Sequence, residues 1–205
     1  MRPLPAREFS GGRTVGPTLA WTAIAGAMYD RGSWKYLSLA LWTAEHGDGS
    51  LLLALSDPFN GRNSDGGYSN LIDANRAVTC LDFPAPRDPA AYEALAREWA
   101  RIAPRFGPLL AYNGIDCAFW PVPPVRVPGP VSAPDAPPIV IVGSTGDPAT
   151  PYAWAVALSK QLTTSVLITR KGEGHTGYNA SRCVDDAVDA YLLGLTIPRT
   201  GLVCR

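Results

Sequence analysis

The stretch Ile139-Val140-Ile141-Val142-Gly143-Ser144-Thr145-Gly146-Asp147-Pro148 decides the fold class of this chain. Its first four residues are apolar and β-branched, which is typical of a strand buried on both faces of a parallel sheet. A loop over 143–151 follows it, and the pattern then predicts a helix from Tyr152 to about Leu162. A second strand over Ser165–Thr169 and a last helix over about 181–193 complete the series. This strand–helix–strand–helix order predicts an α/β fold with a doubly wound sheet.

Upstream of this stretch, residues 14 to about 119 alternate helical patterns with Gly, Pro, Asp and Asn breaks, and no strand stands out. The expected helices are Thr18–Tyr29, Trp34–His46, Ser50–Leu55, Asn70–Cys80 and Pro89–Ile102, with a polar loop over 60–67. Eight prolines lie between Pro121 and Pro138, which excludes a helix or an interior strand there. We therefore expect a mostly helical region over 1–120, a Pro-rich connector over 121–138 and an α/β segment over 139–205.

Charge and hydropathy exclude several classes of function. Lys+Arg and Asp+Glu both number 18, and no basic stripe is present, so nucleic-acid binding is not expected. No apolar run reaches the ~18 residues that cross a bilayer. Arg2, Arg7 and Arg13 precede an apolar stretch over 19–28, which loosely imitates a secretory signal. Prolines interrupt the basic region, however, and Asp30 follows closely, so we interpret the apolar stretch as a folded helix and expect no signal peptide.

The four cysteines are Cys80, Cys117, Cys183 and Cys204. They show no C-x-x-C spacing, and with only two histidines in the chain a zinc site is not expected; no cofactor is expected either. Four cysteines allow three disulfide connectivities, of which the sequential one, Cys80–Cys117 and Cys183–Cys204, is the simplest. Four buried free thiols are the alternative. We favour disulfides, which would place the protein in an oxidising compartment.

Two residues stand where a sheet of this kind positions reactive groups. Asp147 and His175 each follow a predicted strand, on loops at the carboxyl ends of the strands. A carboxylate beside an imidazole fixes its tautomer and stabilises the imidazolium that forms when the ring takes a proton. An acid followed by a histidine after the next strand also matches the last two members of the order Ser, acid, His. Asp147 could instead cap the following helix.

A set of motifs in fixed order allows the sequence to be compared with a particular protein family. In the α/β segment these are Gly143-x-x-x-Asp147-Pro148-Ala149-Thr150-Pro151, Gly172-x-Gly174-His175-Thr176 and Cys183-Val184-x-x-Ala187-Val188-Asp189-Ala190-Tyr191-Leu192. Upstream they are Gly47-Asp48-Gly49, Asn60-Gly61-Arg62, Ala77-Val78-x-Cys80-Leu81-Asp82 and Cys117-x-x-Trp120-Pro121. Over nearly its whole length the chain resembles the C-terminal half of tripeptidyl-aminopeptidase-like α/β-hydrolases, secreted serine peptidases related to prolyl aminopeptidases.

The resemblance implies a fold and a chemistry. The fold would be the C-terminal part of an α/β-hydrolase sheet preceded by a helical cap, in a secreted or cell-envelope protein. A serine would attack a peptide carbonyl near a free N-terminus, His175 would transfer the proton, and Asp147 would orient His175. Cap acids would hold the substrate ammonium; Asp48, Asp57 and Asp65 are candidates, although solvated loop acids are the preferred interpretation of all three.

The chain departs from this family in one respect: no serine lies in a Gly-x-Ser-x-Gly motif. Without a nucleophile and its oxyanion donors, most of the rate enhancement should be lost, so we expect the chain alone to be inactive. One hypothesis is that another, upstream chain supplies the serine half. The alternatives are a non-catalytic binding module and a piece of an esterase with the same fold.

Several other residues are interpreted without chemistry. Ser144 is expected to be only a turn residue, and His46 to end a helix, where its ring suits the helix dipole. Four tryptophans on helical faces are expected to pack rather than to stack on a ligand. They are Trp34, Trp42, Trp99 and Trp154.

Overall fold

The computed structural model describes residues 3–6 and 12–205. It groups the chain into two compact units, one formed by Met1–Arg62 with Pro130–Arg205 and the other by Asn63–Gly129. The predicted division into a helical region, a connector and an α/β segment remains a prediction. In the following, each unit is described by itself.

The α/β segment contains the four elements that the sequence predicts and one short strand that was not predicted. The predicted elements are β3 (Val140–Gly146), α8 (Tyr152–Gln161), β4 (Val166–Glu173) and α9 (Arg182–Gly194), and the additional strand is β5 (Val203–Cys204). The three strands pair in parallel in the order β3-β4-β5, which confirms an α/β fold. Both β3 and β4 continue beyond their apolar residues, because backbone hydrogen bonds extend a ladder irrespective of side-chain polarity.

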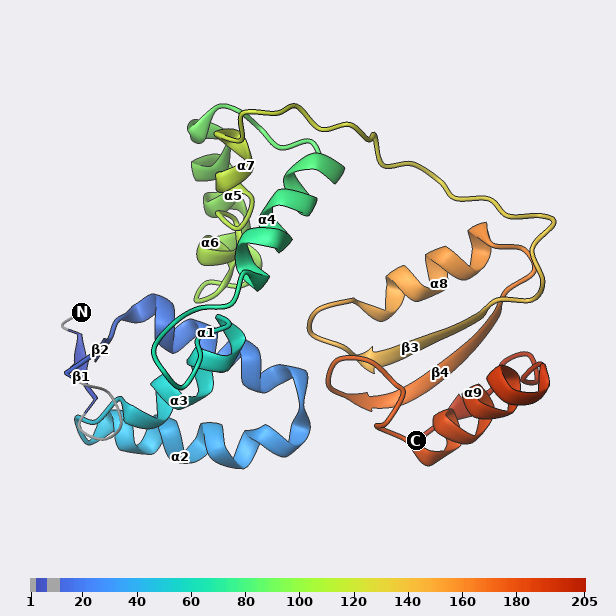
Figure 1. Cartoon of the computed structure of the whole chain (residues 1–205), viewed down its shortest axis with the longest axis horizontal. Coiled ribbons are helices and arrows are strands. Elements are labelled where there is room, and N and C mark those ends of the chain that lie inside the picture. The colour runs from blue at the N-terminus through green and yellow to red at the C-terminus, as the bar shows by residue number, and fades with distance from the viewer. Residues whose placement is uncertain (1–2, 7–11) are drawn as a thin grey trace. The chain divides into compact units, whose positions relative to one another are not determined.

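Helices cover both faces of this small sheet, with α8 and α9 on opposite sides of β3 and β4 (Figure 1). On the α9 side, Ile168 and Val184 are fully buried and pack with Cys204, which is itself disulfide-bonded to Cys183 at the start of α9. On the α8 side, the ring of Tyr152 lies against the backbone of β3 at Gly143. The sheet therefore has the two-sided burial that its near-continuous apolar strands predict.

The register between β3 and β4 changes at the carboxyl end of the pair. Ser144 lies opposite Arg170, but Gly146 lies opposite Glu173, so β4 has an extra residue there. Such a bulge bends the strand and redirects the side chains that follow it. The loop that begins after Glu173 thereby folds back over the end of β3, where Gly174 donates its N–H to the carbonyl of Gly146.

The N-terminal part of the same unit is helical, as predicted, with two short additions, a pair of strands and a 3₁₀ turn. Its elements are β1 (Leu4–Pro5), β2 (Thr14–Val15), α1 (Pro17–Tyr29), the 3₁₀ turn η1 (Arg31–Ser33), α2 (Trp34–Glu45) and α3 (Ser50–Phe59). The antiparallel β1–β2 pair was not predicted, because two residues show no periodicity. The apolar stretch over 19–28 lies within α1, while Arg2 and Arg7 lie outside the described residues. Buried Ala23, Ala40 and Leu52 form the core of these helices.

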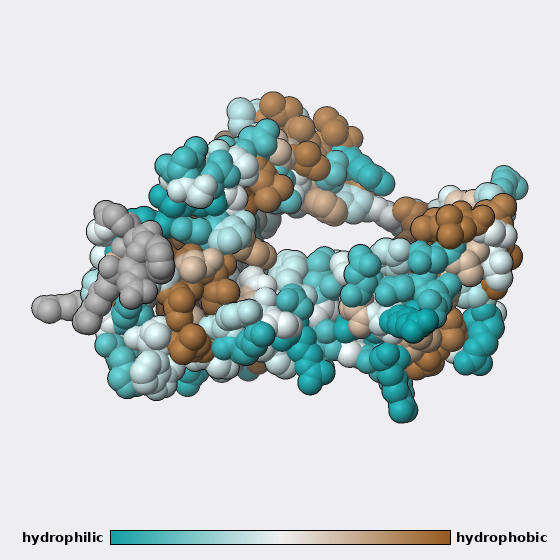
Figure 2. All heavy atoms as spheres, turned by 60° about the horizontal axis from the view of Figure 1, so that its bottom comes forward, coloured by the Kyte–Doolittle hydropathy of each residue, from teal (hydrophilic) through white to brown (hydrophobic). Residues whose placement is uncertain are grey.

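The second unit, Asn63–Gly129, contains α4 (Leu71–Asp82), α5 (Pro89–Ile102) and two single-turn helices that were not predicted, α6 (Gly107–Leu110) and α7 (Ile115–Ala118). One turn is too short for a helical period to show in the sequence. Many large hydrophobic side chains of this unit are exposed, among them Val78, Ile102 and Phe119. Figure 2 shows hydrophobic residues at the surface among the hydrophilic ones.

Each disulfide joins two cysteines of the same unit, and the two disulfides lie in different units. Cys80 on α4 is bonded to Cys117 on α7, and Cys183 on α9 to Cys204 on β5, which is the sequential pairing. This pairing is consistent with an extracellular location. Among the described residues, no helix is both long and apolar enough to span a bilayer.

Candidate active site

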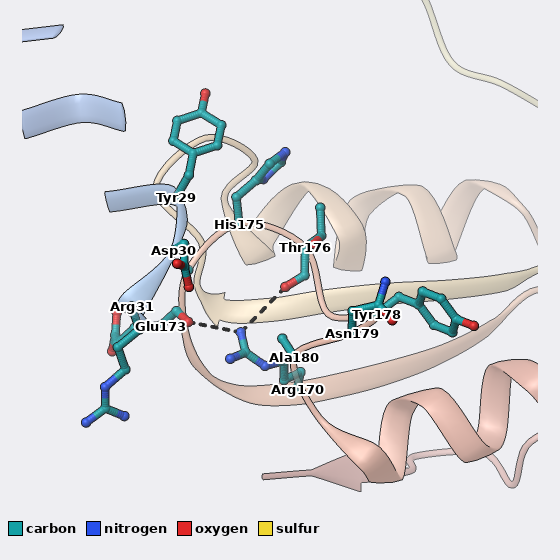
Figure 3. A pocket seen from close by; sticks show the side chains of 11 residues that line it. Tyr29, Asp30, Arg31, Arg170, Glu173, His175, Thr176, Tyr178, Asn179 and Ala180 are labelled. Carbon is teal, nitrogen blue, oxygen red and sulfur yellow. Dashed lines mark hydrogen bonds between the residues drawn. The ribbon is translucent and has the colours of Figure 1, made fainter. Parts of the chain in front are cut away.

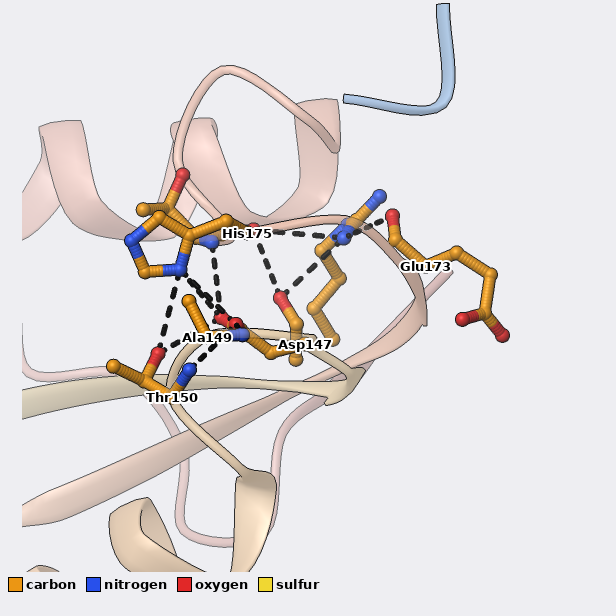
Figure 4. Close-up of polar contacts among 8 residues, drawn as sticks. Asp147, Ala149, Thr150, Glu173 and His175 are labelled. Carbon is orange, nitrogen blue, oxygen red and sulfur yellow. Dashed lines mark hydrogen bonds and ion pairs between the residues drawn. The ribbon is translucent and has the colours of Figure 1, made fainter. Parts of the chain in front are cut away.

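Asp147 and His175 meet at the carboxyl end of the sheet. Asp147 is the first residue after β3, and His175 follows β4 by two residues. Both carboxylate oxygens of Asp147 lie 3.0 Å from Nδ1 of His175, and Figure 4 draws these contacts as dashed lines. The Asp147 side chain is only 3 % exposed, whereas that of His175 is 29 % exposed. The acid is thus enclosed and the imidazole accessible, which is the arrangement expected of a carboxylate that orients a base.

Asp147 is held as a carboxylate by several hydrogen-bond donors. Its Oδ1 accepts the backbone N–H groups of Ala149 and Thr150, at 2.9 and 2.8 Å, and its Oδ2 accepts the Thr150 hydroxyl at 2.9 Å and the Thr176 N–H at 3.1 Å. Burial opposes ionisation, but the donors from Thr150, Ala149, His175 and Thr176 outweigh it and hold the pKa of Asp147 well below its usual range. Asp147 thus also binds the turn before α8, but α8 itself has Pro151 at its N-cap and no side-chain cap, so the alternative prediction of a helix cap is wrong.

The ionised carboxylate decides the tautomer of His175. A carboxylate only accepts hydrogen bonds, so Nδ1 must donate and carry the proton. Among the described residues, none makes a hydrogen bond with Nε2, which is left with its lone pair for an incoming proton. The imidazole ring also makes an edge-to-face contact with Tyr29, at 4.9 Å between ring centres.

The loop that contains His175 has an unusual backbone. Gly174 has φ +104°, and a Cβ atom there would lie 3.1 Å from the carbonyl oxygen of Tyr29. That carbonyl accepts the backbone N–H of His175 at 2.8 Å. Thr176 has φ +68°, a left-handed conformation that β-branched residues rarely adopt. Such strain persists only where surrounding contacts determine the backbone, and it concentrates at functional sites.

Two pockets flank the acid–histidine pair. One, of about 460 Å³, is polar and lies beside Tyr29, Arg31 and Glu173 (Figure 3). The other, of about 390 Å³, is mostly apolar and is bounded by Trp154 and by residues of β3 and α8. His175 lines the first pocket, Asp147 the second, and Thr176 both.

Ser144 differs from its sequence interpretation. It is not a turn residue: it belongs to β3, is 2 % exposed, and donates its hydroxyl to the carbonyl of Thr176 at 2.9 Å. The prediction was wrong because strand pairing with β4 continues past the apolar run. His46 ends α2 as expected, with Nδ1 2.7 Å from the carbonyl of Trp42 and its ring against the Trp42 ring.

The three acids considered for ammonium binding have partners in the protein. Asp57 lies on helix α3 rather than in a loop, and Arg13 forms two hydrogen bonds with it, which keep its pKa low. Asp48 accepts both the N–H and the hydroxyl of Ser50, and Asp65 accepts the N–H of Gly67. These carboxylates therefore bind protein groups and are not solvated loop acids alone.

Of the tryptophans, Trp34 and Trp99 are half-buried, in line with packing. Trp42 and Trp154 are 56 % and 62 % exposed, and Trp154 borders the apolar pocket beside Asp147. Packing within the described chain therefore buries less than half of the surface of each of these two side chains.

Comparison with known proteins agrees with this geometry. A profile of TAP-like proteins matches residues 103–204. The chain belongs to the TAP-like family of α/β-hydrolases. It is 42 % identical over 190 residues to Carboxylesterase B of Mycobacterium tuberculosis and 39 % identical over 188 residues to the serine protease Hip1 of the same species. It is 28 % identical over 199 residues to a tripeptidyl aminopeptidase of Streptomyces lividans.

These matches cover most of this TAP-like chain but a smaller share of each relative. They span 90 %, 87 % and 94 % of this chain and 36 %, 35 % and 36 % of the carboxylesterase, the protease and the aminopeptidase, respectively. The chain thus spans little more than a third of the length of the relatives it matches. Their names describe hydrolases of serine protease, aminopeptidase and esterase type.

Four residues of the site had no assigned chemistry in the sequence: Thr150 and Thr176, whose groups bind Asp147, Tyr29, which contacts His175, and Arg170 beneath the His175 loop. Arg170 offered a signal, because it is a cation directly after an apolar strand and five residues before the histidine. Tyr29 offered none, since only the tertiary fold brings α1 to this loop.

Proposed function

We propose that this chain supplies the acid and the base of a serine aminopeptidase that releases short peptides from substrate N-termini. One observation supports the proposal above the others: Nδ1 of His175 faces both oxygens of a buried, hydrogen-bonded carboxylate, while Nε2 is available. In that arrangement Nε2 takes the proton of a serine hydroxyl as it attacks the peptide carbonyl. Asp147 stabilises the resulting imidazolium, which then protonates the leaving amine.

The nucleophile is proposed to come from a polypeptide encoded upstream of these residues, because none of the serines here lies in a Gly-x-Ser-x-Gly elbow. β3 lies at one edge of the three-stranded sheet, where the strands that bear such an elbow would add. The chain alone is then inactive, since it has neither the serine nor the oxyanion donors.

We further propose that residues 1–120 form the helical cap of this enzyme, that 121–138 connect it to the sheet, and that 139–205 are the C-terminal hydrolase segment. The helices between Pro17 and Ala118, and the lack of any helix or strand over the described residues 121–138, support this organisation. The proposed location is outside the cytoplasm, supported by the two disulfides.

A serine-directed fluorophosphonate probe tests the division of labour. We expect no labelling of the 205-residue chain alone, and labelling of the upstream polypeptide only when this chain is present. His175→Gln should lower the labelling rate by about 10³-fold or more, since the base is lost. His46→Gln is the matched control, because His46 ends α2 and its Nδ1 contacts the carbonyl of Trp42, and it should label at the wild-type rate.

Labelling of this chain by itself would show that it contains a nucleophile and would overturn the proposal. Folded protein that stays unlabelled with the upstream polypeptide would instead favour the non-catalytic binding module. Esterase activity is a second candidate, favoured by the 42 % identity to Carboxylesterase B. The ratio of kcat/KM for a free-N-terminal tripeptide amide to that for a short-chain aryl ester separates the two; the aminopeptidase predicts that acetylating the peptide N-terminus abolishes cleavage.

A further inference from the structure

Arg170 lies beneath the turn that presents His175. It is part of β4, and its Nη1 donates to the backbone carbonyl of Glu173 at 3.1 Å and reaches that of Thr176 at 3.5 Å. These two carbonyls stand on either side of His175 in the sequence. Figure 3 shows the guanidinium between them, on the sheet side of the turn, with the imidazole ring on the other side.

Ser144 completes the contact from the neighbouring strand. Its buried hydroxyl donates to the carbonyl of Thr176 at 2.9 Å and accepts from Arg170 Nη1 at 3.4 Å. One serine on β3 and one arginine on β4 therefore converge on the same carbonyl. All three Arg170 contacts are made by Nη1, whose two N–H groups are shared between the Glu173 carbonyl at 3.1 Å and the two more distant acceptors.

The other side of Thr176 is bound by the acid itself, since its N–H donates to Asp147 Oδ2 at 3.1 Å. Both peptide groups of this residue are thus fixed while its backbone is left-handed, at φ +68°. A left-handed conformation is unfavourable for a β-branched residue, so without these bonds the turn would relax. Relaxation of Thr176 would rotate the preceding peptide and turn the imidazole of His175 away from Asp147.

We propose that Arg170, together with Ser144, is a positioning residue that sets the His175 turn so that Nδ1 faces Asp147. The catalytic importance of this role rests on the proposed function. The orientation of His175 itself is a property of this chain alone. Arg170 acts through the backbone carbonyls on either side of the histidine and touches neither the ring nor the carboxylate. Its loss should change the orientation of the base more than the stability of the fold.

The histidine content of the chain makes the test direct. With only His46 and His175 present, ¹⁵N-histidine labelling gives two ring systems, and His46 is the internal reference. Imidazole ¹⁵N shifts report which ring nitrogen holds the proton, and backbone amide exchange of Thr176 reports its bond to Asp147. Wild-type protein should show His175 with the proton on Nδ1 and slow exchange at Thr176.

Arg170→Met keeps the length and apolar stem of the side chain and removes every donor. We expect a mixture of His175 tautomers and about tenfold faster exchange at Thr176, the size expected for losing a charge-assisted hydrogen bond. Ser144→Ala should have a smaller effect in the same direction. Lys171→Met, which removes the exposed cation next in sequence, is the control and should leave both readouts unchanged.

Rescue separates positioning from general destabilisation. Free guanidinium at low millimolar concentration should restore the Nδ1 tautomer in Arg170→Ala, and Arg170→Lys should be intermediate, because it keeps the charge but does not place a donor where Nη1 lies. Folded Arg170→Met with wild-type tautomer and exchange would overturn the inference. If Arg170→Met does not fold, Arg170→Lys and Ser144→Ala decide by the same readouts. A proton on Nε2 of His175 in the wild-type protein would instead contradict the proposed function. The amide exchange rate of Thr176 would then still test the positioning role of Arg170.

Discussion

The α/β segment over 140–205 and the helical unit Asn63–Gly129 each contain one disulfide, but the surroundings of that disulfide differ. Cys204 is buried with Ile168 and Val184 in an apolar cluster formed by the parallel strands β4 and β5 with helix α9. In the helical unit, the buried hydrophobic side chains of the described residues are few and mostly small: Cys80, Tyr92, Ala96, Ala111 and Ala118. A disulfide that supplements a core and a disulfide that substitutes for one should have different effects when removed.

The largest effect is expected in the helical unit. Replacing both Cys80 and Cys117 by serine opens a loop with a sequence separation of 37. The loop-entropy relation predicts that this lowers the free energy of unfolding by about 4 kcal/mol. We expect α4 to α7 to lose hydrogen-exchange protection while β3 and β4 keep it. Region-resolved exchange measured by mass spectrometry checks this. Retained protection in α5 would show that the helical unit has enough core of its own.

The matched pair Cys183→Ser and Cys204→Ser opens a shorter loop, with a separation of 21, worth about 3 kcal/mol. Because Ile168 and Val184 remain packed, we expect β5 to detach and the end of the chain to fray, while β3 and β4 stay paired. Urea unfolding followed by circular dichroism gives the loss of stability. Collapse of the whole segment would erase the proposed difference between the two disulfides.

Acid should act on the α/β segment through Asp147. Its pKa in the folded protein lies below that of an unfolded aspartate, about 3.9, so its contribution is fully present above that value and is lost as the pH falls further. We expect the free energy of unfolding to decrease from about pH 4 downward. Asp147→Asn should cost about 2 to 3 kcal/mol at neutral pH and flatten this decrease. An unchanged acid dependence in Asp147→Asn would assign the effect to other carboxylates.

The smallest effect is expected from a single hydroxyl in the helical unit. Tyr92 Oη lies 3.0 Å from the carbonyls of both Pro86 and Gly114, and joins α5 to the loop before α7. With both disulfides intact, Tyr92→Phe should cost about 1 kcal/mol. Tyr112→Phe is the control, since the Tyr112 ring stacks on Tyr92 without a hydrogen bond of its hydroxyl among the described residues. Thermal unfolding of both variants supplies the comparison.

The same contrast explains how far the sequence predicts this structure. The run 139–142 and the order of acid and histidine identified the α/β fold and the pair that meets at its edge, because burial and chain order are local signals. The partners of Arg170 and Ser144 could not be predicted, because they are backbone carbonyls brought close by a register change. Tyr29 could not be assigned either, since its contact depends on tertiary packing of α1.

Short elements were the other limit. The β1–β2 pair and helices α6 and α7 are too brief to show a period, and their positions depend on what they contact. The left-handed Thr176 shows the limit most clearly, because nothing in its residue type indicates that conformation. At Thr176 the observed backbone conformation opposes the preference of the residue type, as is expected at a functional site.

The pairing of the cysteines has a consequence for handling the protein. Neither disulfide joins the residues before the Pro-rich segment to those after it, since one closes at Cys117 and the other begins at Cys183. Residues 121–130 are exposed and form neither helix nor strand, so a protease that nicks the chain there would leave two pieces held by noncovalent contacts alone. They should separate on a denaturing gel without any reducing agent, which makes an accidental clip in a preparation visible at once.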